Sequence, residues 1–233
     1  MNILVTGASK GIGKVIAENL KSVGNVFVTG RNEKALKSIG ASGFCVCDLA
    51  KDFEIIVNFV VENNIDVLIN NAGEYVYGGV EEVGFEEIER IFMTNLVAPT
   101  KLISKVVPFM KQNKWGRIVN IGSISGVMGE AYASSYSGSK AGLVGLTKSL
   151  ALELAEFGIT INTINPGWVE TDLGLNSIEE SDFTKEEILE GIPQKRFVQP
   201  EEVANLVKYL VTEQAKGLTG QSINLCAGLS VGI

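Results

Sequence analysis

Short apolar segments alternate with longer segments of helical periodicity along most of this chain. The apolar segments are bounded by Gly, Asn or Asp, as buried strands usually are. They predict seven strands, near residues 3–6, 26–29, 43–47, 67–70, 117–121, 160–164 and 222–225. Helices are predicted between them, near residues 11–23, 32–38, 52–63, 85–110, 136–157 and 200–212.

This order of elements predicts the fold class. Repeated strand–helix–strand units with right-handed crossovers give a parallel sheet that helices cover on both faces. We therefore expect one doubly wound α/β domain over residues 1–233, with ligands bound at the carboxyl ends of the strands. Residues 172–197 are too long for an ordinary connection and are expected to form a lid over that site.

The composition of the chain limits the kinds of partner that it can bind. The chain has 233 residues, of which 45% are apolar, enough to bury a substantial core. No apolar run approaches the roughly 18 residues that span a membrane, so we expect a cytoplasmic protein. The net charge of -7 disfavours nucleic acid and anionic membranes as partners.

The numbers of histidine and cysteine residues limit the catalytic mechanisms and metal sites that are possible. The chain has no histidine, which excludes Ser-His-Asp catalysis and leaves Tyr, Lys, Cys and carboxylates to carry protons. Its cysteines, Cys45, Cys47 and Cys226, are odd in number and suit reduced core thiols. Without histidine to complete a Cys-x-Cys half-site, no metal is expected.

A glycine-rich turn follows the first predicted strand, in the run Thr6-Gly7-Ala8-Ser9-Lys10-Gly11-Ile12-Gly13. Such a turn lets backbone N–H groups and a helix N-terminus approach a pyrophosphate. The spacing is neither G-x-G-x-x-G nor that of a P-loop. A tight turn that binds no ligand is the alternative interpretation.

The end of the second predicted strand bears on the choice of dinucleotide. An acidic residue there binds the ribose 2'-hydroxyl, and a basic one binds a 2'-phosphate. Arg31, together with Lys10, favours NADP over NAD. Glu33 is the competing candidate, but behind the N-cap Asn32 it more simply complements its own helix dipole.

Two further strand ends carry residues suited to a cofactor. Asp48 follows the third strand, where its carboxylate can accept a hydrogen bond from adenine, and a turn or cap is the equal alternative. The run Asn70-Asn71-Ala72-Gly73 ends the fourth strand and suits close approach of a cofactor, although alone it would indicate a turn.

Three residues form a catalytic pattern. Tyr136 and Lys140 are four residues apart on a predicted helix, so they share one face. A neighbouring ammonium group favours phenolate, so we expect Lys140 to lower the pKa of Tyr136. Ser123, just past the fifth strand, can hydrogen-bond a substrate oxygen. A half-buried phenol beside a solvated lysine is the alternative for the pair taken alone.

On these motifs the whole chain resembles the short-chain dehydrogenase/reductase family, whose Rossmann-type sheet has strand order 3-2-1-4-5-6-7. The resemblance implies hydride transfer between a nicotinamide and a carbonyl carbon, with NADP(H) preferred and NAD(H) open. It assigns catalytic roles to Tyr136 as general acid, Lys140, Ser123 and, through a proton relay, Asn95. It also implies association, as a homotetramer or homodimer through the helices predicted at 85–110 and 136–157. Cofactor contacts are implied or expected at Gly7, Ser9, Lys10, Gly11, Ile12, Gly13, Arg31, Asn32, Asp48, Leu49, Asn71, Ala72, Gly73, Tyr136, Lys140, Pro166, Gly167, Val169 and Thr171.

Within that family the segments 148–151, 165–172 and 218–221 are most similar to 3-oxoacyl-acyl-carrier-protein reductases. Those enzymes dock an acidic carrier protein on two basic residues. Lys114 preserves one of them, whereas Phe157 stands at the other. A small ketone or alcohol of another kind is the alternative substrate, and a catalytically silent dinucleotide sensor is the alternative outside enzymes. The substrate rim is expected to be apolar and aromatic, with Ser123, Tyr75, Tyr77, Val127, Trp168, Leu173 and Leu175, although these residues are as well explained by packing of the lid.

Overall fold

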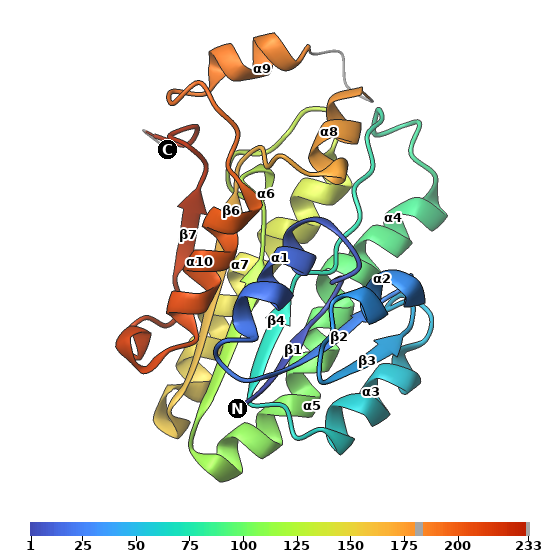
Figure 1. The fold of residues 1–233 in the computed structure, drawn as a ribbon. Helices are drawn as coiled ribbons and strands as arrows, with labels where there is room; N and C mark the ends of the chain where they lie inside the picture. Colours follow the sequence, from blue (N-terminus) through green and yellow to red (C-terminus); the bar gives the residue numbers. More distant parts are fainter. Residues whose placement is uncertain (180–183, 232–233) are drawn as a thin grey trace.

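A computed structural model describes residues 1–179 and 184–231. Its seven strands form one sheet with every neighbouring pair parallel, in the order β3-β2-β1-β4-β5-β6-β7 (Figure 1). The predicted sheet and strand order are confirmed. The strands are β1 (Asn2–Val5), β2 (Asn25–Gly30), β3 (Gly43–Val46), β4 (Val67–Asn70), β5 (Gly116–Ile121), β6 (Ile159–Pro166) and β7 (Ser222–Leu225).

The chain reverses direction across the sheet between β1 and β4. From β1 it runs outward through β2 to β3, and then returns to place β4 on the other side of β1. The connections that leave β1 and β4 therefore diverge, which opens a crevice at their carboxyl ends. The core strands β4, β5 and β6 are buried along their full length, as expected where helices cover both faces.

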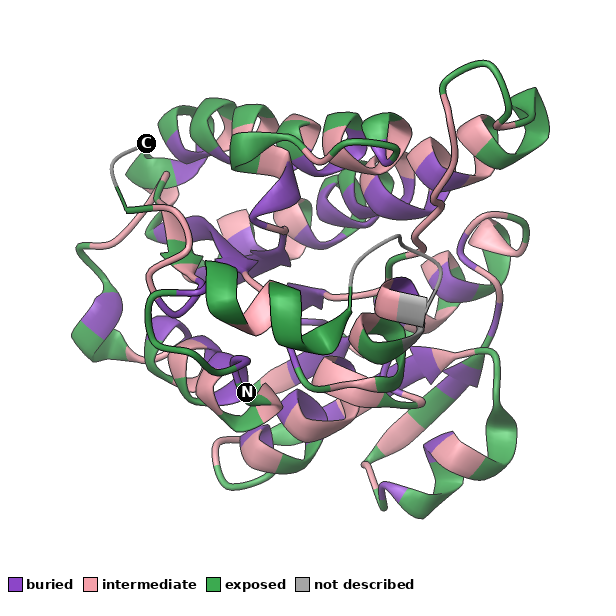
Figure 2. Ribbon diagram, turned by 90° about the horizontal axis from the view of Figure 1, so that it is seen from above, coloured by how far each residue is buried: buried purple, intermediate pink, exposed green. Residues whose placement is uncertain are grey.

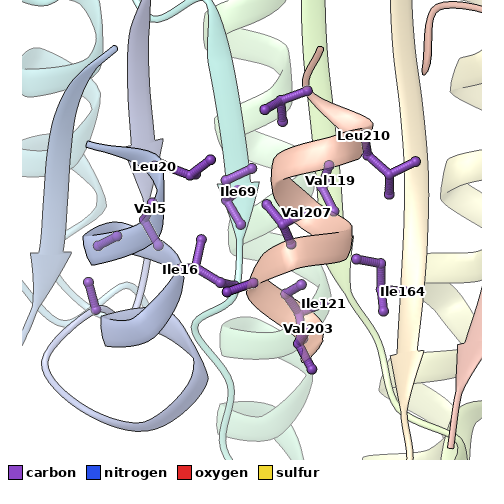
Figure 3. Packing of buried hydrophobic residues seen from close by; sticks show 14 of the residues in the cluster. Val5, Ile16, Leu20, Ile69, Val119, Ile121, Ile164, Val203, Val207 and Leu210 are labelled. Carbon is purple, nitrogen blue, oxygen red and sulfur yellow. The ribbon is translucent and has the colours of Figure 1, made fainter. Parts of the chain in front are cut away.

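One helical layer is built around α1 (Gly11–Leu20) and α10 (Pro200–Leu210), which pack against each other and against the sheet (Figure 3). Ile16 of α1 and Val207 of α10 are fully buried against strand residues such as Ile69 and Val119. The short helix α2 (Glu33–Ser38) adds Leu36 to the same cluster. The burial of these aliphatic side chains fixes the helix that starts at the glycine turn.

The other face of the sheet carries α3 (Phe53–Glu62), α5 (Ala98–Asn113) and α7 (Ser134–Leu154). Leu102 and Met110 of α5 and Leu154 of α7 are buried there against Leu68 and Ile118. Figure 2 shows the resulting pattern, with buried residues on the inner surfaces and exposed ones on the outer helix faces. None of the helices in the described ranges is long and apolar enough to cross a bilayer.

The prediction of one regular helix at 85–110 is wrong, because the α-helix is interrupted within this range. It consists of α4 (Phe85–Phe92), a π-helical turn at Met93–Val97 and α5. Pro99 has no N–H to donate to the carbonyl of Asn95, so one α-helical hydrogen bond is missing at this turn. The backbone N–H of Ala98 instead donates to the carbonyl of Met93, five residues back. Asn95 thus lies at an irregular turn inside a long helix.

Other boundaries also differ from the prediction. The helix α1 ends at Leu20, and α7 begins two residues earlier than predicted and is followed by a 3-10 turn at Ala155–Phe157. A second 3-10 turn lies at Glu213–Ala215. Three short helices were not predicted: α6 (Ser125–Met128), α8 (Asp172–Glu179) and α9 (Lys185–Gly191). The last two lie above the carboxyl ends of the strands (Figure 1), in the segment expected to be a lid. Closure of that segment stays a prediction, and residues 180–183 lie outside the described part.

Candidate active site

A cavity of about 650 Å³ lies at the carboxyl ends of the strands. Its walls come from the segments that follow β1, β2, β3, β4, β5 and β6. This is the place where the strand order predicts a ligand site. Every residue that the sequence predicted to contact the cofactor lines this one cavity.

The glycine turn is packed too closely for side chains. Gly7 has a φ of +66°, and a Cβ added there would lie 2.7 Å from the Cα of Ala72. A Cβ at Gly13 would lie 2.5 Å from the carbonyl oxygen of Gly7. Thr6 Oγ1 accepts hydrogen bonds of 3.0 Å from the backbone N–H groups of Asn71 and Ala72, which joins the two segments. The resulting cradle fits a pyrophosphate, because backbone can approach it without obstruction.

Four charged residues form a network at the end of the cavity where adenosine is expected. Glu74 Oε1 lies 2.7 Å from Arg31 Nη1 and 2.6 Å from Arg90 Nη2, and Arg90 Nη2 lies 3.0 Å from Asp48 Oδ2. Burial opposes ionisation of Asp48, but hydrogen bonds from the Ala50 backbone and from Arg90 outweigh it and hold the pKa of Asp48 below its ordinary value. No pattern in the sequence indicated Glu74 or Arg90 as site residues. The only available signal was that Glu74 directly follows the predicted Asn71-Ala72-Gly73 run.

Glu33, the acidic residue that competed with Arg31 as the ribose contact, has a structural role in the neighbouring helix α2. Asn32 Oδ1 accepts a 3.0 Å hydrogen bond from the backbone N–H of Ala35, so Asn32 is the N-cap. Glu33 pairs with Lys37 at 2.7 Å on the same helix, and it does not line the cavity. Among these residues, Arg31 remains the candidate for a 2'-phosphate, with its guanidinium exposed beside Glu74.

Ser123, Tyr136 and Lys140 meet at the centre of the cavity wall. Ser123 follows β5, and the other two lie one turn apart on α7. Lys140 is buried and its Nζ donates a 2.9 Å hydrogen bond to the carbonyl of Ile121 at the end of β5. Burial lowers the pKa of Lys140 to about 8.

Tyr136 differs from the expectation in its electrostatics. Burial raises the pKa of its phenol to about 12, the hydrogen bond with Ser123 lowers it, and the charge of Glu130 raises it further. The predicted lowering of this pKa by Lys140 is wrong, because taking both groups out of water disfavours phenolate and ammonium alike. Tyr136 therefore holds its proton at neutral pH, the state that a general acid requires.

Asn95 is buried behind the cavity wall and not on it. Its Nδ2 donates to the carbonyl of Glu74 at 2.9 Å and to Ser139 Oγ at 3.0 Å, and its Oδ1 accepts from the N–H of Glu74 at 2.9 Å. The side chain thus ties the segment after β4 to α7. Its role in a proton relay stays a prediction.

The substrate side of the cavity is more polar than expected. Ser123, Tyr75, Trp168 and Leu173 line the cavity as predicted, whereas Val127, Tyr77 and Leu175 do not. Met128 lines it in place of Val127, because α6 turns successive residues to different sides. Ser125 and Glu130, which the sequence argument missed, also line it. The ring of Tyr75 packs edge-on against Tyr136, with 4.9 Å between ring centroids.

Cofactor contacts were expected at the end of β6 and just beyond it, and Pro166, Gly167, Val169 and Thr171 do line the cavity. A Cβ at Gly167 would lie 2.9 Å from the Cα of Cys226, so only glycine fits between β6 and the C-terminal segment. Within residues 1–179 and 184–231, no three His, Cys, Asp or Glu side chains gather as a metal site.

Comparison with known proteins agrees with this geometry. Residues 7–230 match the family model described as "Enoyl-(Acyl carrier protein) reductase". The chain is 38% identical over 250 residues to a "Granaticin polyketide synthase putative ketoacyl reductase 1" of Streptomyces violaceoruber, covering 97% of this chain and 92% of the relative. It is 37% identical over 232 residues to the 3-oxoacyl-(acyl-carrier-protein) reductase FabG of Rickettsia felis, covering 97% and 95%.

Solved structures give the same result. A crystal structure of an actinorhodin polyketide ketoreductase variant with NADPH matches at a TM-score of 0.92 and 38% identity, covering 99% of this chain and 97% of that one. A putative NAD(P)-dependent gluconate 5-dehydrogenase from Beutenbergia cavernae, with bound NADP, matches at 0.90 and 31%, covering 98% and 96%. The chain belongs to the short-chain dehydrogenase/reductase family. It is accordingly an oxidoreductase that uses a nicotinamide dinucleotide.

Proposed function

We propose that this enzyme reduces a ketone with NADPH, with Tyr136 as the proton donor. The observation that carries the proposal is the meeting of Ser123, Tyr136 and Lys140 in the same cavity as the glycine turn. Similar proteins include ketoacyl reductases and a ketoreductase crystallised with NADPH.

The chain's own residues would divide the work as follows. The glycine turn at Gly7–Gly13 and the N-terminus of α1 hold the pyrophosphate, and Arg31 holds the 2'-phosphate. When bound, NADPH supplies the hydride for the carbonyl carbon. Ser123 hydrogen-bonds the ketone oxygen and Tyr136 delivers a proton to it as negative charge develops. Lys140, anchored on the carbonyl of Ile121, places its charge beside the phenol.

Replacing Tyr136 by Phe tests this assignment. The phenol hydroxyl is the only group removed, so turnover of ketones with NADPH should fall by about 100-fold or more, the usual size of a general acid's contribution. Binding of NADPH, measured by the fluorescence of the reduced nicotinamide, should stay within about twofold. Undiminished turnover would refute the role of Tyr136, and binding without turnover in the wild type would favour the dinucleotide sensor.

We propose 3-oxoacyl thioesters as the first substrates to test, because several relatives are named for them. A carrier protein would need basic residues near the cavity entrance. Phe157 replaces one of the expected pair, but Lys111 Nζ lies 4.2 Å from its ring centroid and Lys114 lies close in sequence. Lys111, Lys114 and Phe157 all precede β5 or β6, so they lie at the end of the sheet opposite the cavity, and within one chain they do not support docking of a carrier at its entrance. Equal kcat/KM for a carrier-bound and a carrier-free acetoacetyl thioester would argue for a small ketone instead.

We also propose that the enzyme associates as a homodimer or homotetramer through α5 and α7. Leu152 of α7 is 86% exposed, and an interface along this helix would cover it. Sedimentation of the wild type and of Leu152→Glu measures this, since a charge in such an interface should shift the protein towards monomer.

A further inference from the structure

A glutamate lies in the substrate part of the cavity, and neither the motifs nor the proposed reaction uses it. Glu130 follows α6 and is half-buried at the cavity wall. Its Oε1 accepts a 2.7 Å hydrogen bond from the hydroxyl of Tyr75, and its Oε2 accepts a 2.5 Å hydrogen bond from Ser125 Oγ. The carboxylate thus joins the segment after β4 to the segment after β5.

These two hydrogen bonds determine what the wall offers to a ligand. The hydroxyl protons of Tyr75 and Ser125 are both given to Glu130, so each oxygen presents only lone pairs to the cavity. Ser123 Oγ donates to Ser125 Oγ at 3.1 Å. Its single proton must turn from Ser125 to the ketone oxygen when a substrate binds, so Ser123 is the one hydroxyl of the three that can donate to the ligand. A carboxylate has about four acceptor sites, and the two bonds leave others open. This wall therefore accepts hydrogen bonds and offers few.

The charge of Glu130 is also uncompensated locally. Among the described residues no Lys or Arg pairs with it, although eight ion pairs are formed elsewhere. Lys140, the buried cation of the cavity, donates a hydrogen bond to the carbonyl of Ile121 and forms no ion pair with Glu130. A carboxylate near the reacting oxygen opposes the negative charge that develops there during reduction. A hydrogen-bond donor on the substrate would offset that opposition.

We propose that Glu130 determines substrate specificity by selecting ketones that carry a hydroxyl or ammonium group within reach of the carbonyl. The proposal rests on ketone reduction at this site and refines its substrate class. Each oxygen of Glu130 already accepts one hydrogen bond, so the selection depends on its remaining acceptor sites. A ligand that covers the half-buried carboxylate without donating to it excludes water from those sites and leaves them unpaired. A ketone with a carboxylate or phosphate at the same position would be repelled.

The test compares two ketones of nearly equal shape, 2-hydroxycyclohexanone and 2-methylcyclohexanone, with NADPH as reductant. The wild type should prefer the hydroxyketone in kcat/KM by about tenfold or more. Glu130→Gln keeps the size of the side chain and removes its charge, so it should reduce this preference mainly through KM. Glu130→Leu should abolish it. Glu153→Gln, an exposed glutamate changed in the same way on α7, should leave the preference unchanged.

Binding separates failure of this proposal from failure of the proposed reaction. Tyr136→Phe enzyme with NADPH should bind the hydroxyketone more tightly than the methylketone in titration calorimetry, and Glu130→Gln in that background should remove the difference. A difference that persists, or is absent from the start, overturns the specificity role whether or not either ketone is reduced. An equal loss for both ketones in Glu130→Gln also overturns it, because Glu130 would then only hold Ser125 and Tyr75 in place.

Discussion

Arg31 forms an ion pair with Glu74 at the point where it is expected to bind a 2'-phosphate. Its side chain is 64% exposed and that of Glu74 is 20% exposed, so the pair contributes little to stability. Arg90 binds the same oxygen of Glu74, which leaves the carboxylate shared between two guanidinium groups. Because Glu74 is shared, it offsets the charge of Arg31 only in part, and a phosphate at Arg31 would meet the remaining positive charge.

Replacing Arg31 by Asp should shift the preference from NADPH towards NADH. Loss of a charge-assisted hydrogen bond to phosphate costs about 1.5–3 kcal/mol, so the ratio of kcat/KM for NADPH to that for NADH should fall about 10- to 100-fold. The same charge change at Lys216, which does not line the cavity, is the control. A constant ratio would show that Arg31 is a surface charge only.

The buried Lys140 predicts a particular pH dependence. Because the pKa of Lys140 is lowered to about 8, its charge is present below that pH and lost above it, whereas Tyr136, with a pKa of about 12, keeps its proton throughout. In the direction of ketone reduction, kcat/KM should therefore fall as pH rises past about 8.

Lys140→Arg tests which group causes this fall. Arginine stays protonated, so the fall should move beyond about pH 10 even if overall activity drops. A fall that stays near pH 8 in this variant would assign it to another group.

At the scale of elements, α6 and α7 are packed so tightly that one glycine decides the geometry of the active site. A Cβ on Gly126 of α6 would lie 2.7 Å from the backbone carbon of Lys140 and 2.8 Å from the nitrogen of Ala141. Backbone atoms cannot move aside as a flexible side chain can. The segment that carries Ser123 and Ser125 is held against Lys140 only because no side chain lies between them.

Gly126→Ala should therefore lower the free energy of unfolding by about 1–3 kcal/mol and reduce kcat, since either α6 or α7 must move. Gly138→Ala on α7 is the matched control. Its nearest neighbour, Phe92 Cζ, would be 3.5 Å from the new Cβ, an ordinary contact. That variant should be slightly stabilised, by up to about 1 kcal/mol, because alanine favours helix. Chemical denaturation measures both, and equal effects would contradict the packing argument.

The elements that the sequence predicted well are those with a strong hydrophobic pattern. Strands β1 and β4 were found because a strand covered on both faces is a nearly continuous apolar run, whereas β6 was found although it alternates isoleucine with polar residues. The π-helical turn at Met93–Val97 was missed, since an apolar periodicity does not register one missing N–H at Pro99. Glycine-turn and Tyr-Lys residues could be placed from spacing alone. Glu74 and Glu130 could not, because their partners, Arg31 and Tyr75, are 43 and 55 residues away along the chain.

At the scale of the whole molecule, the cavity is assembled from six strand ends that are far apart in sequence. A cofactor that contacts these segments together binds the folded chain and not the unfolded one. Binding should therefore stabilise the entire fold by mass action.

NADPH at about 100 times its Kd should add about 2.7 kcal/mol and raise Tm by about 5–10 °C for a domain of this size. NADH at the same concentration should raise Tm less, because it has no 2'-phosphate for Arg31. Differential scanning fluorimetry measures both shifts. Equal shifts would count against the inferred preference for NADPH.

The hydrogen bonds of Asn95 join the adenosine end of the cavity to the helix that carries Tyr136 and Lys140. Asn95 bonds both the N–H and the carbonyl of Glu74, while the side chain of that same residue forms ion pairs with Arg31 and Arg90. One residue, Glu74, is thus tied through Asn95 to α7 and through its side chain to Arg31. Because Asn95 holds Glu74 through its backbone, a substitution of that side chain can change the charge beside Arg31 while the tie to α7 stays in place.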